Sequence, residues 1–244
     1  MTPLKNPSEL RIALEAGAET TALVYRASES DAGSTVILGH GAGAAQRSAF
    51  MVNTARALAS LGVDVVTFNF LYSEQQRRIP DRAPALEACY RGVIETVAAR
   101  IAHARPLFIG GKSMGGRIAT QVAAADPALP LAGLVLLGYP LHPPGRPDQR
   151  RDKHLPAVGR PMLFVQGSRD AFGTPGELAP VLAAFDRLPR SAATIHVVEG
   201  GDHSFKLARA NAAAQAAAMD DVYRTVVAWI QQISSMTSPS RLNP

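Results

Sequence analysis

One serine of the chain stands among glycines. The stretch "PLFIGGKSMGGRIAT" (106–120) places Ser113 between Gly111 and Gly115, with an apolar run directly before it and an amphipathic run directly after it. A G-x-S-x-G turn between a strand and a helix presents its serine as a nucleophile, and the small flanking residues let the backbone turn without a clash. The pattern therefore predicts a nucleophilic Ser113, and a simple strand-to-helix turn is the alternative. A phosphate loop is excluded, because its G-x-x-x-x-G-K spacing would need a glycine where Pro106 stands.

A serine hydroxyl is a poor nucleophile at neutral pH, so it needs a base and the base needs an orienting acid. On this type of turn the order along the chain is serine, then Asp or Glu, then His. The run "PMLFVQGSRDAFG" leads to Asp170 and the run "ATIHVVEGGDHSF" leads to His203. Both residues follow predicted strands, so we expect them at the same carboxyl edge of the sheet as Ser113. Asp202 is the alternative acid, but it would have to fold back onto its neighbour.

The loop "LGHGAGAAQ" (38–46) follows another predicted strand and supplies candidates for an oxyanion hole. In such a site one amide comes from the residue after the nucleophile, here Met114, and one from this loop, here Ala42. His40 and the glycines of the loop are predicted to border the site. The alternative for them is an ordinary strand exit.

Apolar strands alternate with amphipathic helices along the rest of the chain, which predicts an α/β fold with a mostly parallel central sheet and helices on both faces. One domain is expected over 1–244, with β segments in 1–33 and a frayed tail at 234–244. An Ala-biased stretch at 210–219 is a helix or its approach. The expected strands are 10–16, 20–28, 34–41, 63–70, 106–111, 131–139, 161–167 and 193–200, and the expected helices are 48–62, 83–104, 114–125, 175–185 and 221–233.

Five segments together carry a family resemblance: "GHGAG", "GGKSMGGRIA", "GYPLHPPGRPD", "LFVQGSRDAFGT" and "GGDHSF". They resemble the α/β-hydrolases near the dienelactone-hydrolase-like group. Most closely they resemble the family of a testis-expressed hydrolase-like protein and a subunit of the nonspecific-lethal chromatin complex, with bacterial members. The resemblance covers about 34–235 and implies the α/β-hydrolase fold with the triad Ser113, Asp170 and His203. It implies no substrate, and the chromatin-complex relative keeps open a non-catalytic scaffold on the same fold.

The segment where a lid would be inserted, 142–160, is short and contains four prolines. It predicts a loop without a lid domain, and hence a fairly open site suited to small or flexible esters. Basic residues could border the mouth of that site and attract an anionic acyl group, or could simply be solvated: Lys112, Arg146, Arg150, Arg151 and His154.

Composition and charge also bear on the partners and the location of the protein. The chain has 244 residues, 47% of them apolar, with a net charge of +5. Its densest basic patch, "GRPDQRRDK" (145–153), contains two aspartates and no aromatic residue, so we expect no nucleic-acid partner. The single cysteine, Cys89, excludes an intrachain disulfide, and no signal peptide or membrane-length apolar run is visible, so a cytoplasmic location without membrane association is expected.

The residues together predict a serine hydrolase that cleaves carboxylic esters through an acyl-enzyme and needs no cofactor or metal. Its expected partner is a small-molecule ester, with thioesters and lactones left open. The oligomeric state is also left open.

Overall fold

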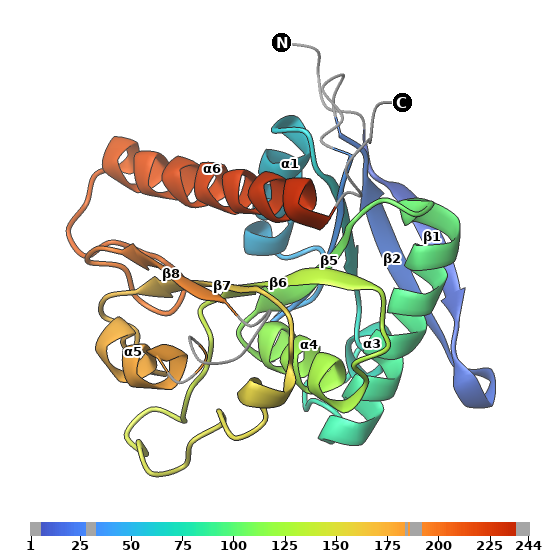
Figure 1. The fold of residues 1–244 in the computed structure, drawn as a ribbon, viewed down its shortest axis with the longest axis horizontal. Helices are drawn as coiled ribbons and strands as arrows, with labels where there is room; N and C mark the ends of the chain where they lie inside the picture. The colour runs from blue at the N-terminus through green and yellow to red at the C-terminus, as the bar shows by residue number, and fades with distance from the viewer. Residues whose placement is uncertain (1–5, 28–32, 184, 186–191, 238–244) are drawn as a thin grey trace, which may run out of the picture.

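A computed structural model describes residues 6–27, 33–183, 185 and 192–237. Its centre is an eight-stranded sheet in the order β1-β2-β4-β3-β5-β6-β7-β8 (Figure 1). The pairs β1–β2 and β2–β4 are antiparallel and the other neighbours are parallel. The strands are β1 (Ser8–Ala13), β2 (Glu19–Tyr25), β3 (Thr35–Gly39), β4 (Asp64–Phe68), β5 (Leu107–Lys112), β6 (Leu131–Leu137), β7 (Met162–Gly167) and β8 (Ala193–Val198).

Helices cover both faces of the sheet, as expected (Figure 1). The helices α1 (Ala49–Ser60) and α6 (Ala212–Thr237) pack on one face, and α3 (Ala83–Val97), α4 (Met114–Ala125) and α5 (Pro175–Ala183) on the other. Shorter elements join them: η1 (Glu15–Gly17), the single turn α2 (Leu71–Glu74), the π-helical turn η2 (Ala98–Ala102) and the 3-10 turn η3 (Leu155–Ala157).

The central strands are mainly apolar because both of their faces are buried. In β3, Ile37 packs into the core beneath α3 and α4, while its neighbour Val36 packs into the core beneath α1 and α6. In β5, Ile109 likewise packs beneath α3 and α4, and Phe108 packs beneath α1 and α6. This two-residue alternation with apolar residues on both sides is typical of a parallel sheet between helical layers.

The predicted elements are found, with boundaries shifted by a few residues and two larger differences. The expected helix 83–104 gives way after Val97 to the π-helical turn η2 and ends at His103, which has a φ of 47°. The expectation of a frayed tail from residue 234 is wrong as far as Thr237, because α6 runs through both the Ala-biased stretch and the expected last helix. Ile233 is buried there and Ser234 hydrogen-bonds Ser34 at 2.8 Å, so the helix end is packed. The rest of the predicted tail, 238–244, lies outside the described residues, as do 1–5 and 28–32 of the opening β segments.

The segment between β6 and β7 forms no lid. Within 138–161 the only helical element is the single 3-10 turn η3, as the prolines predicted. Across the described ranges, no helix combines the length and the apolar character that crossing a bilayer would require.

Candidate active site

Ser113 lies on a strained turn between β5 and α4. Its φ of 51° and ψ of −114° are rare for a residue with a side chain, and such strain persists only where the surrounding structure imposes it. The turn packs directly on the backbone of β3: a Cβ on Gly115 would lie 2.1 Å from the carbonyl oxygen of Gly39. Gly111 meets the same oxygen at 2.2 Å and has a φ of +148°. Both positions therefore require glycine, as the sequence indicated.

His203 and Asp170 meet Ser113 at the carboxyl edge of the sheet. The Nε2 of His203 lies 2.8 Å from the Oγ of Ser113, and its Nδ1 lies 2.8 and 3.0 Å from the two carboxylate oxygens of Asp170. The ring of Phe172 stacks on the imidazole, with centroids 4.1 Å apart. The alternative acid, Asp202, accepts hydrogen bonds from the amides of its own loop instead. Serine, imidazole and carboxylate thus form one continuous hydrogen-bonded chain.

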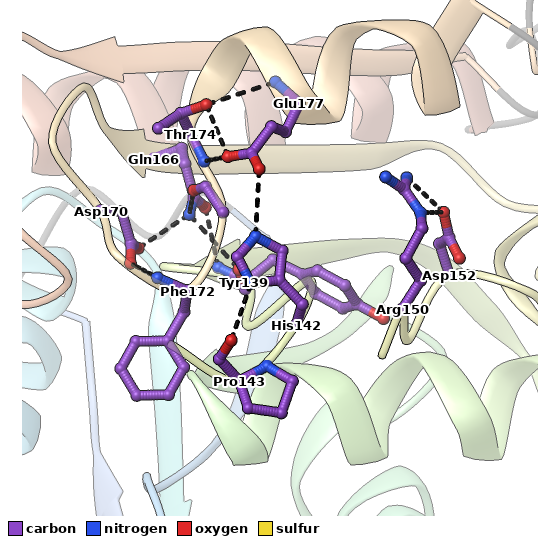
Figure 2. A network of polar contacts seen from close by, with 11 residues as sticks. Tyr139, His142, Pro143, Arg150, Asp152, Gln166, Asp170, Phe172, Thr174 and Glu177 are labelled. Carbon is purple, nitrogen blue, oxygen red and sulfur yellow. Dashed lines mark hydrogen bonds and ion pairs between the residues drawn. The ribbon is translucent and has the colours of Figure 1, made fainter. Parts of the chain in front are cut away.

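A buried network holds Asp170 (Figure 2). The carboxylate is 1% exposed, and a buried carboxylate needs hydrogen-bond donors. The amide of Phe172 donates to its Oδ1 and the Nε2 of Gln166 donates to its Oδ2, both at 2.8 Å. Gln166 also donates to the carbonyl of Gly173 at 2.7 Å and accepts from the amide of Tyr139 at 2.8 Å. Sequence reasoning missed Gln166, although a polar residue inside the apolar run "PMLFVQG" was a visible signal.

The same loop is fixed at its far end, where α5 begins. The carboxylate of Glu177 accepts two hydrogen bonds from Thr174, from its amide and from its hydroxyl, each at 2.8 Å. These bonds lower the pKa of Glu177. The other oxygen of Glu177 contacts the Nε2 of the buried His142 at 3.2 Å (Figure 2). The loop that carries Asp170 is therefore held at both ends by side chains.

The predicted oxyanion-hole residues lie beside Ser113. Met114 is the first residue of α4, so its amide has no acceptor within the helix. The loop after β3 passes close by, since a Cβ on Gly41 would lie 3.8 Å from the Cβ of Ser113. Within the described residues the amide of Ala42 donates no hydrogen bond, and its carbonyl is held by the hydroxyl of Tyr72 at 2.9 Å. Met114 and Ala42 also line the same cavity as Ser113, so both amides are candidates for the oxyanion hole.

His40 does not border the mouth of the site, contrary to the sequence prediction. It is fully buried under the loop that carries Ala42. Its Nδ1–H donates to the carbonyl of Gly41 at 2.9 Å and its Nε2 accepts from the amide of Phe70 at 3.2 Å. Burial lowers the pKa of His40, which agrees with this neutral form. The ring holds the loop in place.

Ser113 opens into a cavity of about 600 Å³. Of the basic residues predicted at its mouth in the 142–160 segment, Arg151 lines the cavity. Arg146 is exposed and away from it, and His154 contacts the hydroxyl of Thr120 at 2.8 Å, so both predictions are wrong. Burial, followed by the nearby charge of Arg117, lowers the pKa of His154 to about 4.

Lys112 is not solvated, because it is only 8% exposed, but it does line the cavity that holds Ser113. Its ammonium group donates to the carbonyl of His203 at 2.5 Å and lies 5.7 Å from the ring centroids of Phe50 and Phe205. Burial lowers its pKa to about 8. The residue before the nucleophile therefore connects the serine turn to the histidine loop.

A mostly parallel sheet with a serine on the turn between a central strand and the following helix defines the class of α/β-hydrolase folds. Residues 32–231 match the family described as an alpha/beta hydrolase domain, and the chain belongs to that family. Within the described ranges, no group of three or more His, Cys, Asp or Glu side chains is placed to hold a metal ion.

Solved structures share this fold at low sequence identity. An α/β serine hydrolase without a lid from Xanthomonas campestris is 23% identical, with a TM-score of 0.65 over 92% of this chain and 98% of that one. A dienelactone hydrolase from Anabaena variabilis is 19% identical, with a TM-score of 0.66 over 93% and 99%. The esterase domain of a Rhodothermus marinus protein is 14% identical, with a TM-score of 0.68 over 93% and 99%.

Proposed function

We propose that this α/β hydrolase is a serine hydrolase that cleaves carboxylic esters through an acyl-enzyme. The observation that carries the proposal is the hydrogen-bonded chain from the Oγ of Ser113 through His203 to Asp170. Ser113 is the nucleophile, His203 the general base and Asp170 the acid that orients the imidazole.

In the first half-reaction the Oγ of Ser113 attacks the ester carbonyl and the Nε2 of His203 takes the hydroxyl proton. The amides of Met114 and Ala42 stabilise the negative charge on the former carbonyl oxygen. The C–O bond of the ester then breaks, and His203 returns the proton to the departing alcohol. Water, activated by the same imidazole, attacks the acyl-enzyme and releases the acid and free Ser113.

The shape of the site favours small or flexible esters, since no lid covers the cavity. The names of the solved neighbours, an esterase domain and a dienelactone hydrolase, support ester or lactone cleavage, and thioesters belong to the same chemistry. The narrower resemblance to the testis-expressed and chromatin-complex family and the cytoplasmic location stay predictions.

Covalent labelling with a fluorophosphonate and turnover of p-nitrophenyl acetate test the proposal. Wild-type protein should label at Ser113 and hydrolyse the ester. Ser113→Ala should lose labelling and about 10⁶-fold in kcat. Its circular dichroism should be unchanged, because a smaller side chain fits the same turn. Ser204→Ala is the matched control, since this exposed hydroxyl lines the same cavity and should not be needed.

A folded protein that neither labels nor hydrolyses any ester or thioester of a length series would contradict the proposal. That result would favour the alternative function, a non-catalytic scaffold on the hydrolase fold.

A further inference from the structure

Two arginines lie on the wall of the cavity that holds Ser113. Arg117 stands one turn beyond Ser113 on α4, and its amide donates to the carbonyl of Ser113. Arg151 comes from the segment between β6 and β7, and both residues line the same cavity. Burial first, and then the charge of Arg151, lowers the pKa of Arg117. Both positive charges therefore belong to the wall of one cavity.

Among the residues that the structure describes, neither guanidinium group has a carboxylate partner. Arg117 donates to the neutral side chain of Gln121 at 3.2 Å, and its Nε is buried without an acceptor. Across the part of the chain that the structure describes, the guanidinium group of Arg151 makes no hydrogen bond or ion pair.

The acidic groups nearby are engaged elsewhere or too distant for an ion pair. Asp81 lines the same cavity, but its carboxylate pairs with Arg77 at 2.6 Å, and Asp152 pairs with Arg150 at 2.5 Å. Glu87 is the other acidic group near Arg117, and within the described residues the two form no ion pair. Two like charges in a partly buried wall, without a counter-ion, are unfavourable until an anion binds between them.

Most of the remaining wall is apolar. It includes the side chains of Phe50, Met51, Leu86, Met114 and Phe172. The cavity thus pairs an apolar surface with the positive charges of Arg117 and Arg151, a short distance along α4 from the nucleophile. Lys112 also lines this cavity, with its ammonium group on the carbonyl of His203. An uncharged ester would leave the two arginines without a partner.

We propose that Arg117 and Arg151 form a subsite for a carboxylate, so that the substrate is an ester with an apolar body and a second, anionic end. The proposal rests on the proposed function, since it names the substrate class of the same site. Guanidinium groups suit this role because their planar N–H forks match the two oxygens of a carboxylate.

The test compares two esters that differ only in that charge. The p-nitrophenyl ester of adipic acid keeps a free carboxylate, and its methyl-capped analogue is neutral. We expect a kcat/KM about tenfold to hundredfold higher for the carboxylate ester, the range given by one to two charge-assisted hydrogen bonds. The preference should persist in 0.5 M NaCl, because direct contact is screened less than long-range attraction by the net charge of +5.

Variants then assign the preference to residues. Arg151→Gln and Arg117→Gln should each remove most of it by slowing the carboxylate ester, while the neutral ester changes less than threefold. Arg146→Gln is the matched control, since this exposed arginine of the same segment does not line the cavity. It should keep the full preference. The wild-type comparison needs no variant to fold, so the proposal is testable in either case.

Several outcomes would overturn the subsite alone: equal rates for both esters, a preference that disappears in salt, or a loss in the control equal to the loss in Arg151→Gln. A phosphonate-ended analogue that is faster than the carboxylate ester would reassign the subsite to phosphate-bearing ligands and also overturn it. Turnover of the neutral ester that depends on Ser113 would meanwhile keep the proposed function. If neither ester is cleaved and no fluorophosphonate label appears, the proposed function itself fails.

Discussion

The turn that carries Ser113 and the loop that carries Asp170 are fixed by different means. The serine turn is fixed by backbone packing, since Gly111 and Gly115 bring it against the carbonyl of Gly39 with no room for a side chain. The aspartate loop is fixed by side-chain hydrogen bonds, because Gln166 of β7 bonds Asp170 and Gly173 of the loop and the amide of Tyr139 just after β6. Steric contact of this kind is all-or-none, whereas a hydrogen-bonded network can lose one member and keep its shape.

The two regions therefore differ in what a substitution does to them. A side chain added to the serine turn must move a strand, so the damage reaches the whole fold. A donor removed from the aspartate loop leaves the backbone in place and affects the orientation of one carboxylate. The predictions below test this difference, beginning with the largest effect.

Gly115→Ala should abolish folding or lower the free energy of unfolding by more than about 3 kcal/mol, the scale of a severe core clash. The added Cβ would lie within 2.4 Å of both the carbonyl carbon and the oxygen of Gly39, and backbone atoms cannot rotate away. Urea denaturation measures the change. Gly43→Ala is the control, because a Cβ there meets nothing within 4 Å, and it should stay within about 1 kcal/mol of the wild type. Equal stability of the two variants would remove the argument for steric fixation.

Asp170→Asn should lower kcat by about 10⁴-fold while the fold persists, because an amide favours the wrong tautomer of His203. Turnover of p-nitrophenyl acetate and the thermal midpoint measure the two effects separately. Asp202→Asn should change kcat less than tenfold, since its carboxylate only accepts from the amides of Ser204 and Lys206. The acid assignment is wrong if Asp202→Asn does the greater damage.

Gln166→Leu should lower kcat by about 10- to 100-fold and leave KM within about threefold, since one charged hydrogen bond to Asp170 is lost. Gln166 is fully buried and is not among the residues that line the cavity, so we expect it to act as a positioning residue. The variant also leaves the amide of Tyr139 without its acceptor. The kcat is therefore measured under conditions in which circular dichroism shows that the variant is folded. A lower thermal midpoint with an unchanged kcat would mean that Gln166 stabilises the fold and does not orient Asp170 for catalysis.

The sequence predicted the serine turn well, because the glycines that make the turn sterically possible and the apolar strand before it are neighbours of Ser113 in the sequence. The ends of β5, β7 and β8 were also visible, and they brought Ser113, Asp170 and His203 to one edge. The sequence did not predict which polar side chains face inward. His40 and Lys112 follow or end strands in the same way as the triad residues, and only the packing of other elements decides that they are buried.

Lys112 joins the two kinds of region, because it belongs to the serine turn and its ammonium group donates to the carbonyl of His203. Its pKa falls from 10.5 to about 8 on folding, mainly through burial. Between these values the unfolded chain binds the proton that the folded chain has released. The stability of the wild type relative to Lys112→Met must therefore rise with pH across this window, by at most about 1.4 kcal/mol per pH unit.

Urea denaturation of wild type and Lys112→Met at pH 7, 8, 9 and 10 measures this difference, and other titrating groups cancel because both proteins contain them. At pH 7 the buried charge opposes folding, so the methionine variant should be close to the wild type in stability despite the lost hydrogen bond. Towards pH 10 the neutral amine still donates to the carbonyl of His203, and no charge is buried. The free energy of unfolding of the wild type should therefore rise above that of Lys112→Met. Lys206→Met is the matched control, since this exposed lysine lies in the histidine loop and should give a difference that does not change with pH below 10. A difference for Lys112→Met that is equally flat would mean that the ammonium group is solvated, and that the serine turn and the histidine loop are held independently of each other.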